Sequence, residues 1–286
     1  MRLTVLGSGG NTPIPIPTCQ CPLCTQARSE GRPYSRRGNS LAFPERNAIV
    51  DAPEFIFDAL NRAKIESLDW IFLTHWHPDH VNGLRVVQAR DLTDFDGLID
   101  TLRSDRPTIV TTEAVYERTC DVFGQLEFFV DEAGFATVEF LDDGPLHLDG
   151  WTVRSIPYSL TGDEPDATAF VVDDGIRTCL VATDDARYLP ESAIPARPDL
   201  AVFECGLFER APDGTEIFDE RDRRILADEL THTEILERID ALAPKRTLLT
   251  EIEHLTMRSY DDFHTLESQD EYDGIQFAFD GLEIEV

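Results

Sequence analysis

Short apolar runs, bounded by glycine, proline or charged residues, dominate the hydrophobic pattern of this chain and predict β-strands. The first run, residues 2–6, is closed by glycines, and the run at 70–74 leads directly into a group of histidines. The segment 11–18 carries three prolines and predicts an extended loop. The other predicted strands cover residues 47–50, 108–111, 151–156, 168–172, 177–182, 200–204, 246–250, 275–279 and 282–286.

Helical periodicity is limited to fewer stretches of the chain. Apolar residues recur at helical spacing over 53–63, where a proline stands near the start, and over about 233–242. Thr231 or Thr233 is the N-cap candidate of the second helix. Residues 84 to about 135 are mostly helical in pattern, with one strand among them.

The order of these elements predicts the fold class. Strands outnumber helices and the two alternate irregularly, which favours an α/β fold with two sheets covered by helices, a four-layer αβ/βα sandwich. The chain has no internal repeat and no low-complexity linker, so we expect one domain over residues 1–286.

The charge of the chain is its most unusual bulk property. It has 25 basic and 55 acidic residues, a net charge of −30, and only Lys64 and Lys245 are lysines. This skew predicts adaptation to a salt-rich cytoplasm, where the repulsion between carboxylates is screened over roughly 3 Å at 1 M salt. It also disfavours a broad basic surface for nucleic acid, although salt adaptation weakens that argument.

Targeting signals and the cysteine count indicate in which cellular compartment we expect the protein. No run reaches the ~18 apolar residues that span a bilayer. Glycines interrupt the start of the chain, so a signal-peptide core is missing and we expect a cytoplasmic protein without a membrane partner. Six cysteines are too few for a disulfide scaffold, and a reducing compartment favours metal binding by the three that crowd into 19–24.

The strongest chemical signal is Thr-His-Trp-His-Pro-Asp-His at residues 74–80, which holds three of the seven histidines. On an extended segment His75 and His77 project to the same side, and Asp79 and His80 follow where the chain turns. Imidazoles with a carboxylate suit zinc, iron or manganese. An inconsequential surface patch is disfavoured, because the run ends a predicted buried strand.

The H-x-H-x-D-H pattern at 75–80 after a hydrophobic strand resembles the signature of the metallo-β-lactamase superfamily. The resemblance implies the αβ/βα sandwich and metal-assisted hydrolysis, and the acidic composition resembles that of a haloarchaeal member. It also implies that Asp184, after a later strand, is the bridging carboxylate, with Asp185 as the weaker alternative. His232 matches an active-site histidine that would act as general acid or phosphate clamp; the alternative is a helix-cap histidine facing solvent.

A second candidate metal site is the C-x-C-x-x-C motif of Cys19, Cys21 and Cys24. Closely spaced thiolates hold tetrahedral zinc with a fourth ligand from elsewhere, and unliganded thiols are the alternative. The motif after a Gly-Gly turn resembles the phosphoribosyl cyclic phosphodiesterase branch of the superfamily, and the pyrroloquinoline quinone pathway protein shares it. That resemblance implies His254 as the fourth ligand of a structural zinc in a loop over 11–30.

Two positions depart from the resembled enzyme. A histidine is expected near Leu160 and another at Glu251, and neither is present. One site would then consist of His75, His77 and Asp184, and a second of Asp79, His80, Asp184 and Glu251. The second set is richer in oxygen, which shifts its preference toward Mn²⁺. We therefore expect one or two catalytic divalent ions, Zn²⁺ or Mn²⁺.

These expectations define a metal-dependent hydrolase that acts on a small, cyclic phosphodiester through a metal-activated hydroxide. Asp79 would hold the second metal and orient the nucleophile, and His232 would serve the departing oxygen. Two alternatives stay open: a catalytically degenerate binding protein of the same fold, and a hydrolase of another ester or of a nucleic-acid substrate. The oligomeric state is open as well, a homodimer included.

Overall fold

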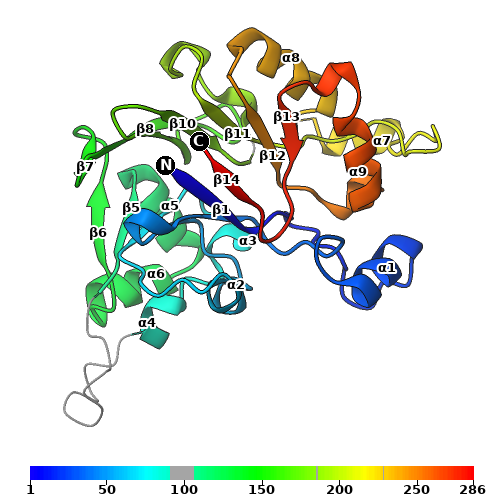
Figure 1. Cartoon of the computed structure of the whole chain (residues 1–286). Helices are drawn as coiled ribbons and strands as arrows, with labels where there is room; N and C mark the ends of the chain where they lie inside the picture. The colour runs from blue at the N-terminus through cyan, green and yellow to red at the C-terminus, as the bar shows by residue number, and fades with distance from the viewer. Residues whose placement is uncertain (91–105, 185, 228) are drawn as a thin grey trace.

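The computed structural model describes residues 1–90, 106–184, 186–227 and 229–286, and two mixed β-sheets form its centre (Figure 1). In the first sheet the strand order is β14-β1-β2-β3-β4-β5-β6, and the run from β3 to β6 is parallel. Its strands are β1 (Arg2–Gly7), β2 (Ser40–Phe43), β3 (Ala48–Val50), β4 (Trp70–Phe72), β5 (Thr108–Thr111), β6 (Thr137–Phe140) and β14 (Glu283–Glu285).

The second sheet has the order β13-β12-β11-β10-β9-β8-β7, and its parallel part runs from β10 to β13. Its strands are β7 (Leu146–Leu148), β8 (Trp151–Tyr158), β9 (Ala167–Asp173), β10 (Thr178–Ala182), β11 (Leu200–Glu204), β12 (Thr247–Thr250) and β13 (Ile275–Phe277). Each sheet therefore has a parallel half, and a parallel half brings the carboxyl ends of its strands to one edge.

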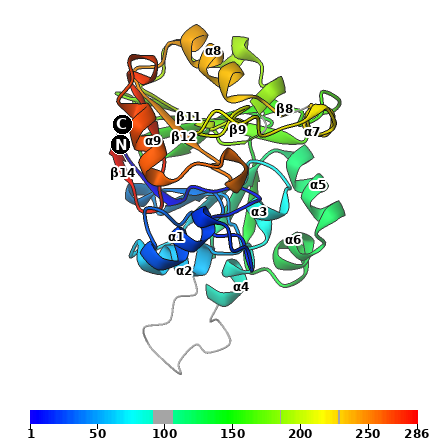
Figure 2. The ribbon, with the colours of Figure 1, turned by 90° about the vertical axis from the view of Figure 1, so that its right-hand side faces the viewer.

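Helices cover the outer faces of both sheets, as the two views show (Figures 1 and 2). The first sheet is flanked by α2, α4, α5 and α6, and the second by α8 and α9. The helices are α1 (Pro22–Glu30), α2 (Ile56–Arg62), α3 (Pro78–Val81), α4 (Val86–Arg90), α5 (Glu113–Val122), α6 (Gln125–Glu127), α7 (Glu220–Ile225), α8 (His232–Leu242) and α9 (Tyr260–Glu267).

Buried apolar side chains form three clusters, one for each interface between the four layers. The cluster between the sheets includes Val5 of β1 and Val181 of β10, and the rings of Phe72 and Phe170 meet edge-on across it at 5.3 Å. A second cluster packs α2 and α5 under the first sheet, and a third packs α8 and α9 onto the second. This layering confirms the predicted αβ/βα sandwich.

Several elements differ from the sequence prediction. The run at 70–74 is a strand only to Phe72, and the predicted helix 53–63 begins at Ile56. The pattern did not indicate β2, α1, α7 or α9; α1 begins at Pro22, where the Cys21 sulfur accepts the Cys24 backbone N–H within the cysteine motif. The predicted helical region 84–135 contains α4, α5 and α6, but its part at 91–105 lies outside the described residues. No helix of the described chain is long and apolar enough to cross a membrane.

Candidate metal centre and cysteine cluster

Strand ends from both sheets deliver the polar residues of one site. The segment after β4 carries the histidine motif, Asp184 follows β10, Glu204 ends β11 and Glu251 follows β12. The strands β10, β11 and β12 are parallel, so their carboxyl ends place these three acidic residues at the same sheet edge. The Thr168 backbone N–H donates to the Thr74 carbonyl at 2.8 Å and so ties the histidine segment to β9 of the second sheet.

Asp51, a residue that the sequence analysis missed, orients two of the histidines. Its fully buried carboxylate accepts hydrogen bonds from the Thr74 backbone N–H at 2.8 Å and from the Thr74 hydroxyl at 2.7 Å. It also lies 2.8 Å from Nδ1 of His80 and accepts that proton. The Thr74 oxygen lies 3.0 Å from Nδ1 of His75 and accepts its proton in turn. In both histidines Nδ1 is therefore engaged, and Nε2 is the ring nitrogen left to coordinate a metal ion.

The Nε2 atoms of these two histidines converge on Asp184. His75 Nε2 and His80 Nε2 each lie 3.4 Å from Asp184 Oδ2. On its other side His80 Nε2 lies 3.7 Å from Asp79 Oδ2 and 3.8 Å from Glu251 Oε1. Two donor groups result, one of His75, His80 and Asp184 and one of Asp79, His80 and Glu251.

The residues present fit a divalent cation. His75 Nε2, His80 Nε2 and Glu251 Oε2 are buried and have no hydrogen-bond partner among the described residues. A buried polar atom without a partner costs on the order of 1–3 kcal/mol, and coordination of an ion would satisfy all three atoms. Imidazole nitrogen together with carboxylate oxygen is a donor set for zinc and manganese.

Crowded carboxylates set the electrostatics of this region. Burial would raise the pKa of Asp184, but the nearby rings of His75 and His80 outweigh it and hold this pKa well below its usual range. Burial, followed by the charge of Asp184, raises the pKa of Glu251 well above normal. A cation between these groups would relieve the repulsion between Asp184 and Glu251 that contributes to the raised pKa of Glu251.

His77, a predicted ligand, lies beside these groups and not within them. Its ring centroid is 4.6 Å from that of His75, and it lines the cavity next to Asp79. Burial, followed by the charge of His75, lowers the pKa of His77 to about 4, so the ring is neutral at pH 7. The structure thus brings His75 and His80 to Asp184, as the two predicted sets require, and leaves His77 outside both donor groups.

His232 lies in a packed aromatic stack at the start of α8. Its Nδ1 donates to the Cys205 carbonyl at 2.7 Å, and its Nε2 lies 3.0 Å from the Tyr272 hydroxyl. The Phe208 ring stacks on it at 3.9 Å, and burial lowers the pKa of His232 to about 4. Both ring nitrogens are engaged, and the ring is not among the described residues that line the cavity.

Two further positions bear on the sequence analysis. Leu160, where the resemblance called for a histidine, is 6% exposed and packs in the same apolar cluster as Tyr158, with Trp76 against it. Its side chain is therefore part of the core and no ligand. Asp185, the alternative to Asp184, lies outside the described residues.

A cavity of about 360 Å³ opens over the donor groups. Six of the fifteen described lining residues are acidic, and none is arginine or lysine. Glu204, which the sequence analysis did not single out, belongs to this lining; burial, followed by the charge of Asp184, raises its pKa to about 8. The acidic lining residues are Asp79, Asp184, Glu204, Glu229, Glu251 and Glu253.

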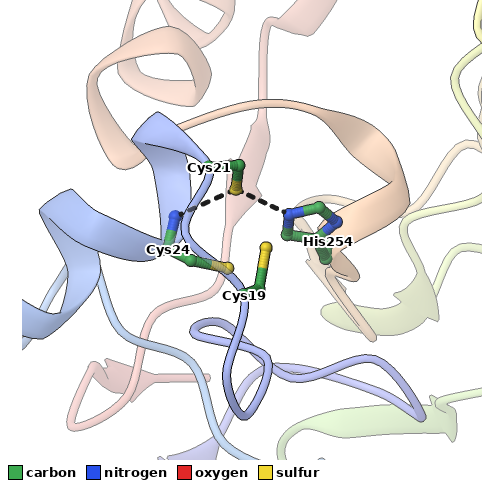
Figure 3. Close-up of side chains that lie close together, drawn as sticks. All are labelled: Cys19, Cys21, Cys24 and His254. Atoms are coloured by element: carbon green, nitrogen blue, oxygen red, sulfur yellow. Dashed lines mark hydrogen bonds between the residues drawn. The ribbon is translucent and has the colours of Figure 1, made fainter.

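The cysteine motif and His254 form a separate cluster (Figure 3). The ligand atoms of Cys19, Cys21, Cys24 and His254 all lie within 4.8 Å of one another, and Cys21 Sγ is 3.2 Å from His254 Nε2. The Cys21 backbone N–H lowers the pKa of Cys19, whereas burial raises the pKa of Cys24 to about 11. Three sulfurs and one imidazole nitrogen in this arrangement fit tetrahedral zinc.

Backbone hydrogen bonds connect the cluster to the cavity. The His254 N–H donates to the Thr12 carbonyl at 3.0 Å, and the Ile252 N–H donates to the Ser8 carbonyl at 2.8 Å. The Thr12 N–H donates to Glu253 Oε1 at 2.9 Å. The loop that leads to the cysteines therefore lies along residues 251–254, and these supply one candidate ligand to each cluster.

Comparison with protein families gives one match over most of the chain. The sequence model of the beta-lactamase superfamily domain matches residues 46–252. This range contains the histidine motif, Asp184 and Glu251, whereas the cysteine motif precedes it and His254 follows it.

Two curated proteins are similar to parts of the chain. An octanoyltransferase of Porphyromonas gingivalis is 42% identical over 145 residues, which cover 46% of this chain and 28% of that protein. Coenzyme PQQ synthesis protein B of Methylobacterium radiotolerans is 32% identical over 134 residues, which cover 41% of this chain and 45% of that protein. The chain thus spans less than half the length of either relative.

Two solved structures share the fold along the whole chain. A diphosphatase from the PhnP family superposes with a TM-score of 0.71 at 20% identity, covering 100% of this chain and 97% of that one. Zn²⁺-bound PqqB from Methylobacterium extorquens superposes with a TM-score of 0.66 at 18% identity, covering 100% of both chains.

Proposed function

This chain belongs to the beta-lactamase superfamily, and we propose that it is a metal-dependent hydrolase that cleaves a small, cyclic phosphodiester. Its fold is that of the metallo-β-lactamase hydrolases, which bind divalent metals such as Zn²⁺. The proposal adds the ligand assignment and the substrate class to this family-level statement.

One observation carries the proposal: in the part of the chain that the structure describes, His75 Nε2, His80 Nε2 and Glu251 Oε2 are buried without a hydrogen-bond partner, around the carboxylates of Asp184 and Asp79. Three such atoms in one place would cost several kcal/mol in an otherwise ordinary core. Metal coordination is the simplest arrangement that accounts for all of them together.

The single free nitrogen of His80 decides how two ions would share the ligands. Because Nδ1 of His80 is bonded to Asp51, only Nε2 can coordinate, and it can serve one ion. With two ions, His80 would join Asp79 and Glu251, while His75, His77 and Asp184 would hold the other. His77 is neutral and its ring lies 4.6 Å from that of His75, which makes it the nearest further imidazole for this ion.

The residues in and around the cavity have different roles in such a reaction. When bound, divalent cations supply Lewis-acid chemistry: they polarise the phosphoryl group and lower the pKa of water. Asp51, through Thr74 and His80, fixes which ring nitrogens face the cations. Asp79 lines the cavity, where it would orient the attacking water, and the packed strand ends keep bulk solvent from the buried donors.

Charge and volume favour a small phosphodiester as the substrate. The described cavity lining has six carboxylates and neither arginine nor lysine, so bound cations must supply the positive charge that an anionic substrate meets. A cavity of about 360 Å³ is at the small end for ligand sites. The motif resembles that of phosphoribosyl cyclic phosphodiesterases, and a structural neighbour is named as a diphosphatase from the PhnP family.

A metal-binding protein of the same fold without catalysis is the second candidate. Leu160 favours it, because this core residue stands where the resemblance called for a ligand. The two candidates differ in turnover and not in metal content.

The decisive experiment combines elemental analysis with an assay of bis(p-nitrophenyl) phosphate and a cyclic nucleotide at high salt. We expect one zinc in the cysteine cluster, one or two further ions, and turnover that Asp184→Asn lowers at least about a thousandfold. His147→Ala, at an exposed histidine on β7, is the matched control and should keep full activity. Bound ions without turnover would favour the second candidate, and unchanged turnover in Asp184→Asn would refute the assigned centre.

A further inference from the structure

Glu204 is a buried carboxyl group beside the metal centre for which the proposed reaction has no use. It ends β11, is 4% exposed, and lines the cavity together with Asp184. Its Oε1 accepts the Ala186 backbone N–H at 2.7 Å, two residues beyond Asp184. The carboxyl group therefore contacts the chain directly after the candidate shared ligand.

Arg238 of α8 holds the same short segment as a hydrogen-bond donor, whereas Glu204 holds it as an acceptor. Its Nη1 donates to the Ala186 carbonyl, and its Nη2 donates to the Arg187 carbonyl at 3.1 Å. Arg187 is itself held by Glu234, with Nη2 and Oε2 3.1 Å apart, and its Nη2 donates to the Glu229 carbonyl at 2.6 Å. Both the N–H and the C=O of Ala186 thus have side-chain partners, one on β11 and one on α8.

We propose that Glu204 is a positioning residue for Asp184: it holds the Ala186 backbone, two residues after this ligand and opposite Arg238, and so keeps the carboxylate within reach of His75 and His80. The Tyr158 hydroxyl supports the same arrangement, because it donates to the Asp184 carbonyl at 2.8 Å. Outer contacts of this kind orient ligating carboxylates, and their loss typically weakens metal binding by about 10–100-fold.

The hydrogen bond from Ala186 also gives a reason for a carboxyl group at position 204, although the carboxylate of Asp184 is near. Ala186 is fully buried, so its N–H would have no water to bond if the acceptor were removed. An acceptor oxygen is what the position needs, whether the group is charged or neutral. Glutamine supplies such an oxygen at the same reach, and alanine does not.

The test is metal binding, because the inference rests on the metal centre of the proposed function and not on its substrate. The protein is given one equivalent of Zn²⁺ for the cysteine cluster and is then titrated with Mn²⁺ by calorimetry. We expect Glu204→Ala to weaken Mn²⁺ binding at least about tenfold and Glu204→Gln to stay within about threefold of the parent. Zinc in the cysteine cluster should be unchanged in both, and Glu237→Ala, at an exposed residue next to Arg238, should behave as the parent.

Three results would overturn the positioning role. These are unchanged Mn²⁺ binding in Glu204→Ala, equal weakening in both Glu204 variants, and full Mn²⁺ binding with lost turnover in Glu204→Gln, which would make the group a catalytic acid. If Glu204→Ala does not fold, Arg238→Met decides: about tenfold weaker Mn²⁺ binding supports the inference, and unchanged binding refutes it. A parent protein that binds neither Mn²⁺ nor a second equivalent of Zn²⁺ would instead refute the proposed function.

Discussion

The two candidate ligand clusters of this protein are built in opposite ways. The cysteine cluster takes three sulfurs from a six-residue stretch of one loop and one nitrogen from His254. The histidine and carboxylate centre takes its donors from the ends of β4, β10 and β12, in both sheets. One cluster depends on a single long-range contact and the other on the register of the whole sandwich.

This difference indicates what a metal ion would stabilise in each cluster. Zinc in the cysteine cluster would hold an otherwise proline-rich loop against residues 251–254. The buried centre needs no ion to hold its strands together, because the core between the sheets already does so. We therefore expect metal loss at the first cluster to act mainly on stability and at the second mainly on activity.

The largest effect should follow from Cys21→Ser, which removes the sulfur that contacts His254. The variant should lose one zinc per chain. At free zinc a hundredfold above the dissociation constant, this loss removes about 2.7 kcal/mol from the free energy of unfolding. Elemental analysis and denaturant unfolding at fixed free zinc measure both quantities.

The control is Cys120→Ser, at a cysteine of α5 outside the cluster, which should keep its zinc. The comparison between the clusters breaks if Cys21→Ser keeps its zinc and its stability. It also breaks if the variant loses all metal, since the buried centre should retain its ions with weakened affinity.

The sequence gives more information about the first cluster than about the second for the same structural reason. Ligands that are neighbours in the chain appear as a motif, so both the cysteine motif and residues 75–80 stand out by spacing alone. Apolar runs likewise located most strands, and the predicted strand 200–204 coincides with β11. These features depend only on local order along the chain.

The supporting residues do not have such a pattern. Asp51 and Glu204 are single acidic residues after short apolar runs, and their roles arise from pairing between β3 and β4 and between β10 and β11. His232 contacts Cys205 and Tyr272, which are 27 and 40 residues away. Such contacts depend on tertiary packing, and a single sequence does not specify them.

We expect an intermediate effect of pH on the free energy of unfolding, caused by the buried side chain of His232. Burial lowers the pKa of His232 from 6.5 to about 4, so the unfolded chain binds the proton more tightly than the folded one. Stability from this residue is complete above pH 6.5 and falls as the pH drops toward 4. Between pH 7 and pH 5 the loss from this residue is about 2 kcal/mol, and unfolding of the parent and of His232→Gln at both pH values measures it.

This measurement separates packing from metal binding at a residue that the resemblance had placed in the active site. The variant should lose less stability between the two pH values than the parent does. His264→Gln, at a histidine whose side chain is 74% exposed, should match the parent. If His232→Gln instead keeps the parent's pH dependence and loses turnover at neutral pH, the ring belongs with the reacting groups.

The smallest expected effect is that of Gly10→Ala on Mn²⁺ binding. This substitution tests whether the two clusters can be perturbed separately at the loop they share. A Cβ on Gly10 would lie 2.1 Å from Glu251 Oε1, so Gly10→Ala must displace this carboxylate. We expect Mn²⁺ binding at the buried centre to weaken about tenfold, equivalent to ~1.4 kcal/mol, because one ligand is moved and none is removed. Zinc in the cysteine cluster should stay bound, since no cysteine is changed.

Gly124→Ala, where a Cβ meets nothing within 4 Å, is the matched control. Loss of zinc in Gly10→Ala with Mn²⁺ binding intact would show that the loop serves the cysteine cluster alone.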